Sequence, residues 1–341
     1  MTGSTGKDKR VLIIHTGGTI GMKKTENGYT PAPGFLKEAL AALDDMRRPE
    51  FPSWELYETS PLLDSSNMSV EEWNSIAALI YESYSEYDGF VILHGTDTMA
   101  YTASALSFIL DGLNKPVVLT GSQIPLSEMR SDARENLITS VIIAAEGVVR
   151  EVSLCFNGRL LRGNRAMKVS ADGFAAFDSP NYPHLAEVGI TVRYNEGALA
   201  RPQPPSELTL RPFSNIPIGV LKIFPGMQFG LFEEIMTERL SGIVLETFGA
   251  GNIPGGTNLL PIIERAFKAG AVITVCSQCP GGTVVLGAYE TSNGLKGAGA
   301  VSGMDMTTEA AVAKLYYLFS FGKSKEEIKL LMEKNLRGEL T

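Results

Sequence analysis

Two short stretches place threonine hydroxyls beside glycines, directly after compact apolar runs. The first is HTGGTI (residues 15–20) after VLII, and the second is HGTDT (residues 94–98) after FVIL. Such runs form buried parallel strands, and open α/β sheets bind ligands at the carboxyl ends of these strands. Thr19 and Thr96 therefore offer hydroxyls together with backbone N–H groups, a combination that suits acyl transfer. Each stretch alone also fits a tight strand-to-helix turn in which threonine caps the helix.

A pair of opposite charges could activate one of these hydroxyls. A threonine hydroxyl is a poor nucleophile until a base or a charged neighbour assists its deprotonation. Asp97 follows Thr96, and Lys168 ends the basic segment RLLRGNRAMK. A desolvated lysine can accept a proton while an aspartate orients it, which is the catalytic triad with Lys in place of His. The pattern predicts a Thr–Lys–Asp relay, although a basic cluster can also be a solvated face.

Two further polar stretches lie between elements. Residues 21–34 form a long Gly/Pro-rich stretch with Tyr29 in its middle, and long loops of this kind often close over active sites. Asp64, Ser65 and Ser66 lie between the end of a strand and the start of a helix. Their side chains could cap that helix or hold the head group of an amino acid.

Composition narrows the class of protein. The chain has 341 residues, of which 44% are hydrophobic and 20% charged, and its net charge is -8. The negative charge argues against a nucleic-acid or anionic-membrane partner. No stretch approaches the ~18 apolar residues that a membrane span needs, and no secretory signal is visible. The three cysteines show no metal-type spacing beyond the lone pair of Cys276 and Cys279, which has no second pair or nearby histidine. We therefore expect a cytoplasmic protein that uses no metal and no cofactor.

The order of elements predicts the fold class. Strands alternate with helices through the first half of the chain, which implies a mostly parallel sheet covered on both faces. Ser69 and Glu72 form a capping box that opens a helix to about Tyr84. The Pro-rich residues 196–216 lack helical periodicity and are interpreted as a linker. We predict a two-domain α/β protein, with a parallel-sheet N-terminal catalytic domain and flanking helices (residues 1–195) and a smaller α/β C-terminal domain (residues 217–341).

The motifs together resemble a known family. TGGTIG at 16–21 and ILHGTDTMAYTASAL at 92–106 are similar to the two signature stretches of bacterial-type L-asparaginases. The resemblance continues through LDSSNM, TGSQIPLSE, the Lys168 region, FGAGN and the C-terminal NLRGELT, and so covers almost the whole chain. The segments SSNM and HGTDTMAYTASALSF are most similar in sequence to the cytoplasmic type I branch. The resemblance implies hydrolysis of L-asparagine to L-aspartate and ammonia, with glutamine as the poorer substrate.

The resemblance also implies a role for each matching residue. Thr19 is expected to attack the side-chain amide and form an aspartyl ester, assisted by Tyr29 on a mobile loop. Thr96, Asp97 and Lys168 are expected to transfer protons and activate the hydrolytic water, and backbone N–H groups near Thr96 to form an oxyanion hole. The residues alone leave open which threonine attacks first. The expected substrate-binding set is Asp64, Ser65, Ser66, Thr96, Asp97 and Asn252.

The resemblance further implies an assembly. Members of the family form homotetramers built from intimate dimers, in which each active site takes residues from both chains. Asn252 of FGAGN matches such a cross-subunit contributor, and Tyr289 is a second candidate. Some type I members carry another asparagine site between subunits, formed with a basic residue and a hydroxyl where this chain has Glu246 and Ala166. Because both differences remove complementarity to a carboxylate, we expect a hyperbolic substrate curve.

Two alternatives share these motifs or this fold. One is the amidohydrolase subunit of a tRNA-dependent amidotransferase, which the negative charge disfavours. The other is a non-catalytic amino-acid sensor, which would tolerate the loss of Thr19 or Lys168, yet both residues are present. A nucleotide-binding protein would instead need a phosphate loop, and TGGTIG lacks that pattern.

Overall fold

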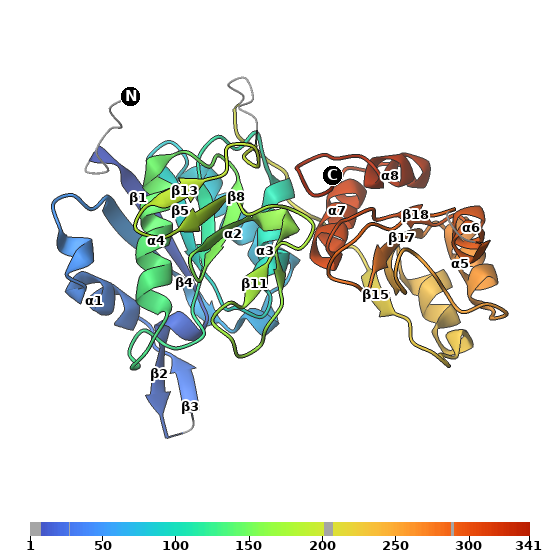
Figure 1. Cartoon of the computed structure of the whole chain (residues 1–341), viewed down its shortest axis with the longest axis horizontal. Coiled ribbons are helices and arrows are strands. Elements are labelled where there is room, and N and C mark those ends of the chain that lie inside the picture. Colours follow the sequence, from blue (N-terminus) through green and yellow to red (C-terminus); the bar gives the residue numbers. More distant parts are fainter. Residues whose placement is uncertain (1–7, 27, 201–206, 288–289) are drawn as a thin grey trace. The chain divides into compact units, whose positions relative to one another are not determined.

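The computed structural model describes residues 8–26, 28–200, 207–287 and 290–341. The chain forms two compact units, unit 1 (Met1–Leu210) and unit 2 (Arg211–Thr341), and many of their helices and strands are labelled in Figure 1. The division falls within the stretch interpreted as a linker, of which residues 201–206 lie outside the described part. Before the division, β14 (Thr209–Leu210) pairs antiparallel with β6 (Leu110–Asp111) of unit 1. The limits predicted for the linker stay a prediction.

Unit 1 contains an eight-stranded sheet in the order β13-β12-β9-β8-β7-β5-β1-β4. The five strands from β8 to β4 are parallel to their neighbours, and the other three join antiparallel. The prediction of a mostly parallel sheet is thus confirmed. The strands are β1 (Arg10–Gly17), β4 (Ser53–Leu63), β5 (Gly89–Leu93), β7 (Val117–Thr120), β8 (Val152–Phe156), β9 (Arg159–Arg162), β12 (Ala186–Val188) and β13 (Val192–Tyr194).

Helices cover both faces of this sheet. Alternate residues of β1 and β5 point to opposite faces, and Val11, Ile13, Val91 and Leu93 pack in one cluster with residues of the first and fourth helices. The long helix α4 crosses in front of the sheet in Figure 1. The helices of unit 1 are α1 (Phe35–Ala42), α2 (Val70–Glu82), α3 (Met99–Ile109) and α4 (Ala133–Glu146).

The predicted capping box begins α2. The Ser69 N–H donates to Glu72 Oε2 at 2.9 Å, and the Ser69 hydroxyl accepts from the backbone at the start of the helix. These bonds satisfy N–H groups that the first helical turn leaves without partners. The helix ends at Glu82, slightly before the predicted Tyr84, because Ser83 to Glu86 form turns.

The stretch 21–34 is more regular than the expected loop. It contains the antiparallel hairpin of β2 (Met22–Thr25) and β3 (Gly28–Pro31), in which Lys24 pairs with Tyr29. Gly28 has a φ of 103°, a conformation that side chains disfavour, so glycine permits the tight turn there. The hairpin stands out from unit 1 in Figure 1, and every residue of β3 is exposed.

Short segments complete unit 1. Two residues each form β10 (Met167–Lys168) and β11 (Phe177–Asp178), which pair antiparallel. Single turns of 3-10 helix are η2 (Thr19–Gly21), η3 (Asp45–Arg47), η4 (Ser65–Asn67) and η5 (Gly163–Arg165). Several of these short segments carry candidate site residues.

Unit 2 is a smaller α/β domain, as predicted. Its four parallel strands are ordered β15-β16-β17-β18. The strands are β15 (Ile218–Lys222), β16 (Gly242–Thr247), β17 (Val272–Ser277) and β18 (Val301–Ser302). The helical segments are η6 (Phe229–Phe232), the π-helical η7 (Ile235–Arg239), α5 (Leu259–Ala269), α6 (Glu290–Gly297), α7 (Thr308–Ser320) and α8 (Lys325–Met332).

The C-terminal residues are anchored in the interior of unit 2. Lys314 of α7 and Glu339 form an ion pair of 2.6 Å, and both side chains are fully buried. Lys314 Nζ also donates to the carbonyl of Met332 at 2.9 Å, and Glu339 accepts from the N–H of Leu336 at 3.0 Å. These bonds offset the cost of removing two charges from water. None of the described helices is long and apolar enough to cross a membrane.

Candidate active site

The two threonine turns lie side by side in unit 1. Strands β1 and β5 are parallel neighbours, with His15 opposite Leu93 in the register, so their carboxyl ends meet at one edge of the sheet. A Cβ added at Gly18 would lie only 2.4 Å from the Gly95 nitrogen. The two backbones are therefore in direct contact, and this contact requires glycine at position 18.

Lys168 joins the second turn through both of its predicted partners. Its Nζ lies 2.8 Å from Thr96 Oγ1 and 2.7 Å from Asp97 Oδ1. Thr96 is buried, whereas the Asp97 side chain is 68% exposed. Lys168 arrives from β10, more than seventy residues further along the chain. The structure thus assembles the Thr–Lys–Asp group, with the Asp97 carboxylate open to an incoming charged molecule.

Gln123 also contacts this group, although its residue type and position did not mark it as a candidate. Thr96 Oγ1 donates to Gln123 Oε1 at 3.3 Å. The Gln123 amide nitrogen donates to the carbonyls of Ala171 and Gly173, at 3.3 and 3.0 Å. Gln123 follows β7, the next strand of the parallel sheet, so the strand-end rule that located Thr96 could also have located it.

The serine stretch packs against the same turn. A Cβ at Gly95 would lie 2.5 Å from Ser65 Oγ, and the Thr98 hydroxyl donates to the Ser65 carbonyl at 2.7 Å. Asp64 Oδ1 accepts from the Ser66 N–H at 2.9 Å and so caps η4. The structure places Ser65 beside the Thr96 turn and engages the Asp64 carboxylate in a local cap, one of the two roles considered for it.

Thr19 begins η2, and its hydroxyl donates to no other residue in the described ranges. The turn rests on His15, since a Cβ at Gly21 would lie 2.6 Å from the imidazole. His15 Nδ1 lies 3.1 Å from Glu58 Oε2, and Glu58 Oε1 accepts from the Gly34 N–H at 2.8 Å. Burial lowers the pKa of the His15 imidazole, although the Glu58 carboxylate opposes that shift.

Tyr29 lies on the projecting hairpin, and the residue is 46% exposed. The hairpin begins directly after η2, at Met22, so Tyr29 and the Thr19 turn belong to one continuous segment. The role predicted for Tyr29 stays a prediction.

The remaining candidates are distributed between the two units. Asn252 lies in unit 2, where its backbone exchanges hydrogen bonds of 2.8 and 3.0 Å with Phe248. Tyr289 lies outside the described residues. Glu246, on β16, accepts from the Thr308 hydroxyl at 2.6 Å, and Ala166 of unit 1 is fully buried. Within the described ranges, no group of three His, Cys, Asp or Glu side chains could hold a metal ion.

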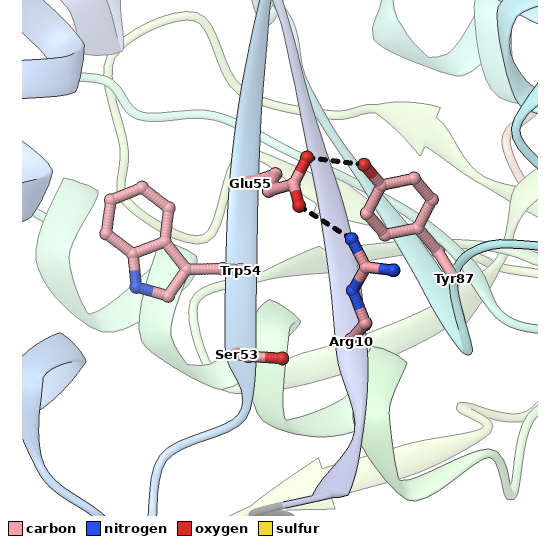
Figure 2. Close-up of a pocket in the computed structure, with 5 residues that line it drawn as sticks. All are labelled: Arg10, Ser53, Trp54, Glu55 and Tyr87. Carbon is pink, nitrogen blue, oxygen red and sulfur yellow. Dashed lines mark hydrogen bonds and ion pairs between the residues drawn. The ribbon is translucent and has the colours of Figure 1, made fainter.

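A second polar cluster lies at the opposite end of the strands. Figure 2 shows the Glu55 carboxylate between Arg10 and the hydroxyl of Tyr87, with both partners 2.7 Å away. Burial and the neighbouring carboxylate raise the pKa of Tyr87 to about 12. Arg10 begins β1 and Glu55 lies near the start of β4, so this shallow pocket is at the amino edge of the sheet. Its charged groups are already paired with each other, which disfavours a ligand site.

Known proteins match the chain along nearly its full length. Residues 10–200 match the family model described as asparaginase, N-terminal, and residues 217–332 match the glutaminase/asparaginase C-terminal domain. L-asparaginase 1 of Escherichia coli K12 is 46% identical over 98% of both chains. A glutamyl-tRNA(Gln) amidotransferase polypeptide of Methanopyrus kandleri is 32% identical over 97% of this chain and 74% of its own.

A solved structure shares the whole fold. L-asparaginase I of Vibrio cholerae superimposes with a TM-score of 0.91 at 45% identity, covering 98% of this chain and 99% of that one. Two family domains in sequence, matched across both units, together with this superposition establish the relationship. The chain belongs to the asparaginase family.

Proposed function

We propose that the protein hydrolyses L-asparagine to L-aspartate and ammonia through a covalent threonyl ester. The observation that carries the proposal is the position of Lys168 Nζ, within hydrogen-bond distance of both Thr96 and Asp97. A hydroxyl, an amine and a carboxylate in series form a proton relay of the triad type. Family membership supports the reaction, and relatives of 45% and 46% identity are named L-asparaginases. The amidotransferase alternative rests on a more distant relative.

In the first half of the reaction, Thr19 Oγ attacks the side-chain amide carbon of asparagine. The amide oxygen becomes an oxyanion that the backbone N–H of Thr96 stabilises. The C–N bond then breaks, the nitrogen takes up the one proton that the Thr19 hydroxyl gives up and leaves as ammonia, and an aspartyl ester on Thr19 remains. Tyr29 assists the attack when its hairpin approaches the substrate.

In the second half, water attacks the ester. The water passes a proton to Thr96 Oγ1, whose own hydroxyl proton moves toward the Lys168–Asp97 pair, which holds it until the ester is cleaved. The ester C–O bond breaks, and the proton held by the relay returns to the Thr19 oxygen, which regains its hydroxyl. The water oxygen stays in the aspartate product. Each group returns to its initial protonation state, so the cycle needs no metal and no cofactor.

Charged side chains at the site explain a preference for a free amino acid. The Asp97 carboxylate is exposed toward an incoming α-ammonium group, and the Ser65 and Ser66 segment offers polar groups to the α-carboxylate. Asp64 supports this segment through its cap on Ser66. We assign Asn252 to the site of a second copy, in an intimate dimer that pairs into a homotetramer in the cytoplasm.

The test is ammonia release from asparagine and from glutamine, measured for wild type, Thr19→Ala and Thr96→Val. Wild type should release ammonia faster from asparagine than from glutamine, since the relatives of 46% and 45% identity are named L-asparaginases. One methylene is worth only ~1–3 kcal/mol, so glutamine should still react at a reduced rate. Both variants should lose kcat by about 10²-fold or more. Mass spectrometry after acid quenching should find the aspartyl ester on Thr19 in the Thr96→Val variant. No ammonia from either amide with wild type would refute the hydrolase assignment.

We also propose that asparagine does not activate this enzyme allosterically through the position of Glu246. The Glu246 carboxylate accepts from Thr308 and would repel a substrate carboxylate, and Ala166 offers no hydroxyl. The substrate curve should therefore be hyperbolic. A strongly sigmoidal curve that Glu246→Ala abolishes would overturn this proposal.

A further inference from the structure

A chain of buried polar side chains lies beneath the Thr96 turn. Trp73 Nε1, on α2, donates to Thr102 Oγ1 at 3.1 Å. Thr102 Oγ1, on α3, lies 2.9 Å from His94 Nε2, and His94 Nδ1 lies 2.7 Å from the Gly95 carbonyl oxygen. His94 and Thr102 are fully buried, and Trp73 nearly so. Three side chains from three elements thus converge on one peptide group.

The direction of every hydrogen bond in this chain is fixed by chemistry. An indole N–H can only donate, and a carbonyl oxygen can only accept. The Gly95 carbonyl oxygen therefore accepts a hydrogen bond from His94 Nδ1, which leaves Nε2 of the neutral ring as an acceptor for the Thr102 hydroxyl. Complete burial lowers the pKa of His94 to about 4, so the imidazole stays neutral near pH 7 and keeps this single tautomer.

The tautomer determines how the Gly95–Thr96 peptide is turned. A trans peptide is planar, and its C=O and N–H point in opposite directions. Because His94 holds the Gly95 carbonyl toward the core, the Thr96 N–H is directed away from the core. No described residue accepts a hydrogen bond from that N–H. The group is therefore oriented and free for an oxyanion.

The surroundings leave the peptide little room to rotate. A Cβ at Gly121 would lie 2.4 Å from the His94 carbonyl oxygen, and Ser65 Oγ lies 2.5 Å from a Cβ at Gly95. These contacts confine the backbone, but they do not select which way the Gly95 carbonyl points. The buried proton on His94 Nδ1 selects that direction.

We propose that His94, fixed by Thr102 and Trp73, is a positioning residue that aims the Thr96 N–H at the substrate's amide oxygen. This inference rests on the proposed function, since it assigns a purpose to the Thr96 N–H in that reaction. Misdirecting an oxyanion donor weakens the transition state more than the bound substrate. Loss of the chain should therefore lower kcat and leave KM nearly unchanged.

The experiment compares Thr102→Val with Thr102→Ser. Valine has almost the same shape but cannot connect Trp73 to His94, whereas serine keeps the hydroxyl. We expect Thr102→Val to lower kcat by about tenfold to a hundredfold with KM within about twofold of wild type. Thr102→Ser should return kcat to within about threefold of wild type. An unchanged kcat in Thr102→Val, an equal loss through KM, or no rescue by serine would overturn the proposal.

A second measurement tests wild type directly, so it does not depend on the folding of a variant. Nitrogen-15 NMR of the His94 ring should show the Nδ1–H tautomer, with no protonation between about pH 8 and about pH 5. An Nε2–H tautomer would overturn the proposal. Wild type that releases no ammonia would instead refute the proposed function, whereas active wild type with an unaffected Thr102→Val variant would refute only the role of His94.

Discussion

Thr96 has two hydrogen-bond partners of opposite kind. Lys168 Nζ lies 2.8 Å from its oxygen, while the hydroxyl proton is directed to Gln123 Oε1, 3.3 Å away. In the proposed reaction that proton has to reach Lys168, so the longer bond to Gln123 must be exchanged during the cycle. Gln123 therefore sets the resting orientation of the hydroxyl, and its amide nitrogen also holds the segment at Ala171 that follows Lys168.

Gln123→Met tests this residue. Methionine has a similar length but neither accepts from Thr96 nor donates to the two carbonyls, so the segment after Lys168 should loosen. We expect kcat to fall by about tenfold and the free energy of unfolding to fall by about 1–2 kcal/mol, measured by ammonia release and denaturant titration. Gln123→Glu keeps the acceptor and loses the donors, so it separates the two effects. Full activity in Gln123→Met would contradict this reading.

His94 also predicts how acid affects stability. Burial lowers its pKa from 6.5 to about 4, so between these values the unfolded chain binds more protons than the folded one. Stability should therefore fall as the pH drops from 6.5 toward 4. One pKa unit is worth about 1.4 kcal/mol, which makes this contribution about 3 kcal/mol.

Denaturant titrations between about pH 7 and about pH 4 measure how steeply the free energy of unfolding changes with pH. His94→Gln should remove the contribution of His94 to this pH dependence. His184→Gln, which changes a partly exposed histidine, should leave that contribution in place. Equal slopes in wild type and His94→Gln would contradict the prediction.

At the scale of elements, a strand together with the turn after it is the unit that the sequence predicts best. VLII and FVIL form the neighbouring interior strands β1 and β5, and the turns that carry Thr19 and Thr96 follow them at the same edge of the sheet, as the pattern predicts. The sequence indicates Lys168 only as the last residue of a basic segment. Its strand, β10, is only two residues long, which is too short to show a strand pattern. Gln123 could not be predicted from residue type, since glutamine in a turn has no distinctive chemistry until its neighbour is known.

The strands β2 and β3 of the hairpin are the elements that the sequence pattern predicts least well. Their residues are almost all polar, so no apolar alternation marks the strands or the pairing of Lys24 with Tyr29. A two-stranded ribbon without a buried face is only marginally stable. The hairpin can therefore change position at little energetic cost, which suits a lid that carries Tyr29.

Tyr29→Phe tests that role. Removing one hydroxyl from an exposed ribbon should leave the melting temperature unchanged, while kcat should fall by about tenfold or more if the hydroxyl assists Thr19. Tyr57→Phe is the matched control, because Tyr57 is 47% exposed and Tyr29 46%, and Tyr57 lies on β4 of the main sheet. A Tyr29→Phe variant as active as Tyr57→Phe would remove Tyr29 from the mechanism.

At the scale of the molecule, two compact units with separate cores were foreseeable from two runs of strand and helix joined by a Pro-rich stretch. The cores themselves are independent, since residues of unit 2 such as Ile243, Ile263 and Ile273 form their own cluster. Assembly was not foreseeable from periodicity, because nothing in a strand pattern indicates which copy a side chain serves. The assignment of Asn252 to a neighbouring copy came from resemblance alone.

Mixing inactive variants can decide which copy Asn252 serves. If each site combines Thr19 of one chain with Asn252 of another, a heterodimer of Thr19→Ala and Asn252→Ala has one doubly defective site and one intact site. Random exchange of equal amounts makes half of the dimers mixed, so about a quarter of wild-type activity should return in a symmetric dimer. The backbone bridge between Phe248 and Asn252 does not depend on the Asn252 side chain, and circular dichroism of Asn252→Ala checks that the variant is folded.

The control mixes Thr19→Ala with Thr96→Val. Gly18 and Gly95 are in direct contact within unit 1, so in the proposed mechanism Thr19 and Thr96 serve the same site from one chain. Every site of that heterodimer then carries one defect, and no activity should return. Recovery in the first mixture but not in the second would establish the dimer as the catalytic unit. Failure of the first mixture, with subunit exchange verified by mass spectrometry, would show that Asn252 acts within its own chain or not at all.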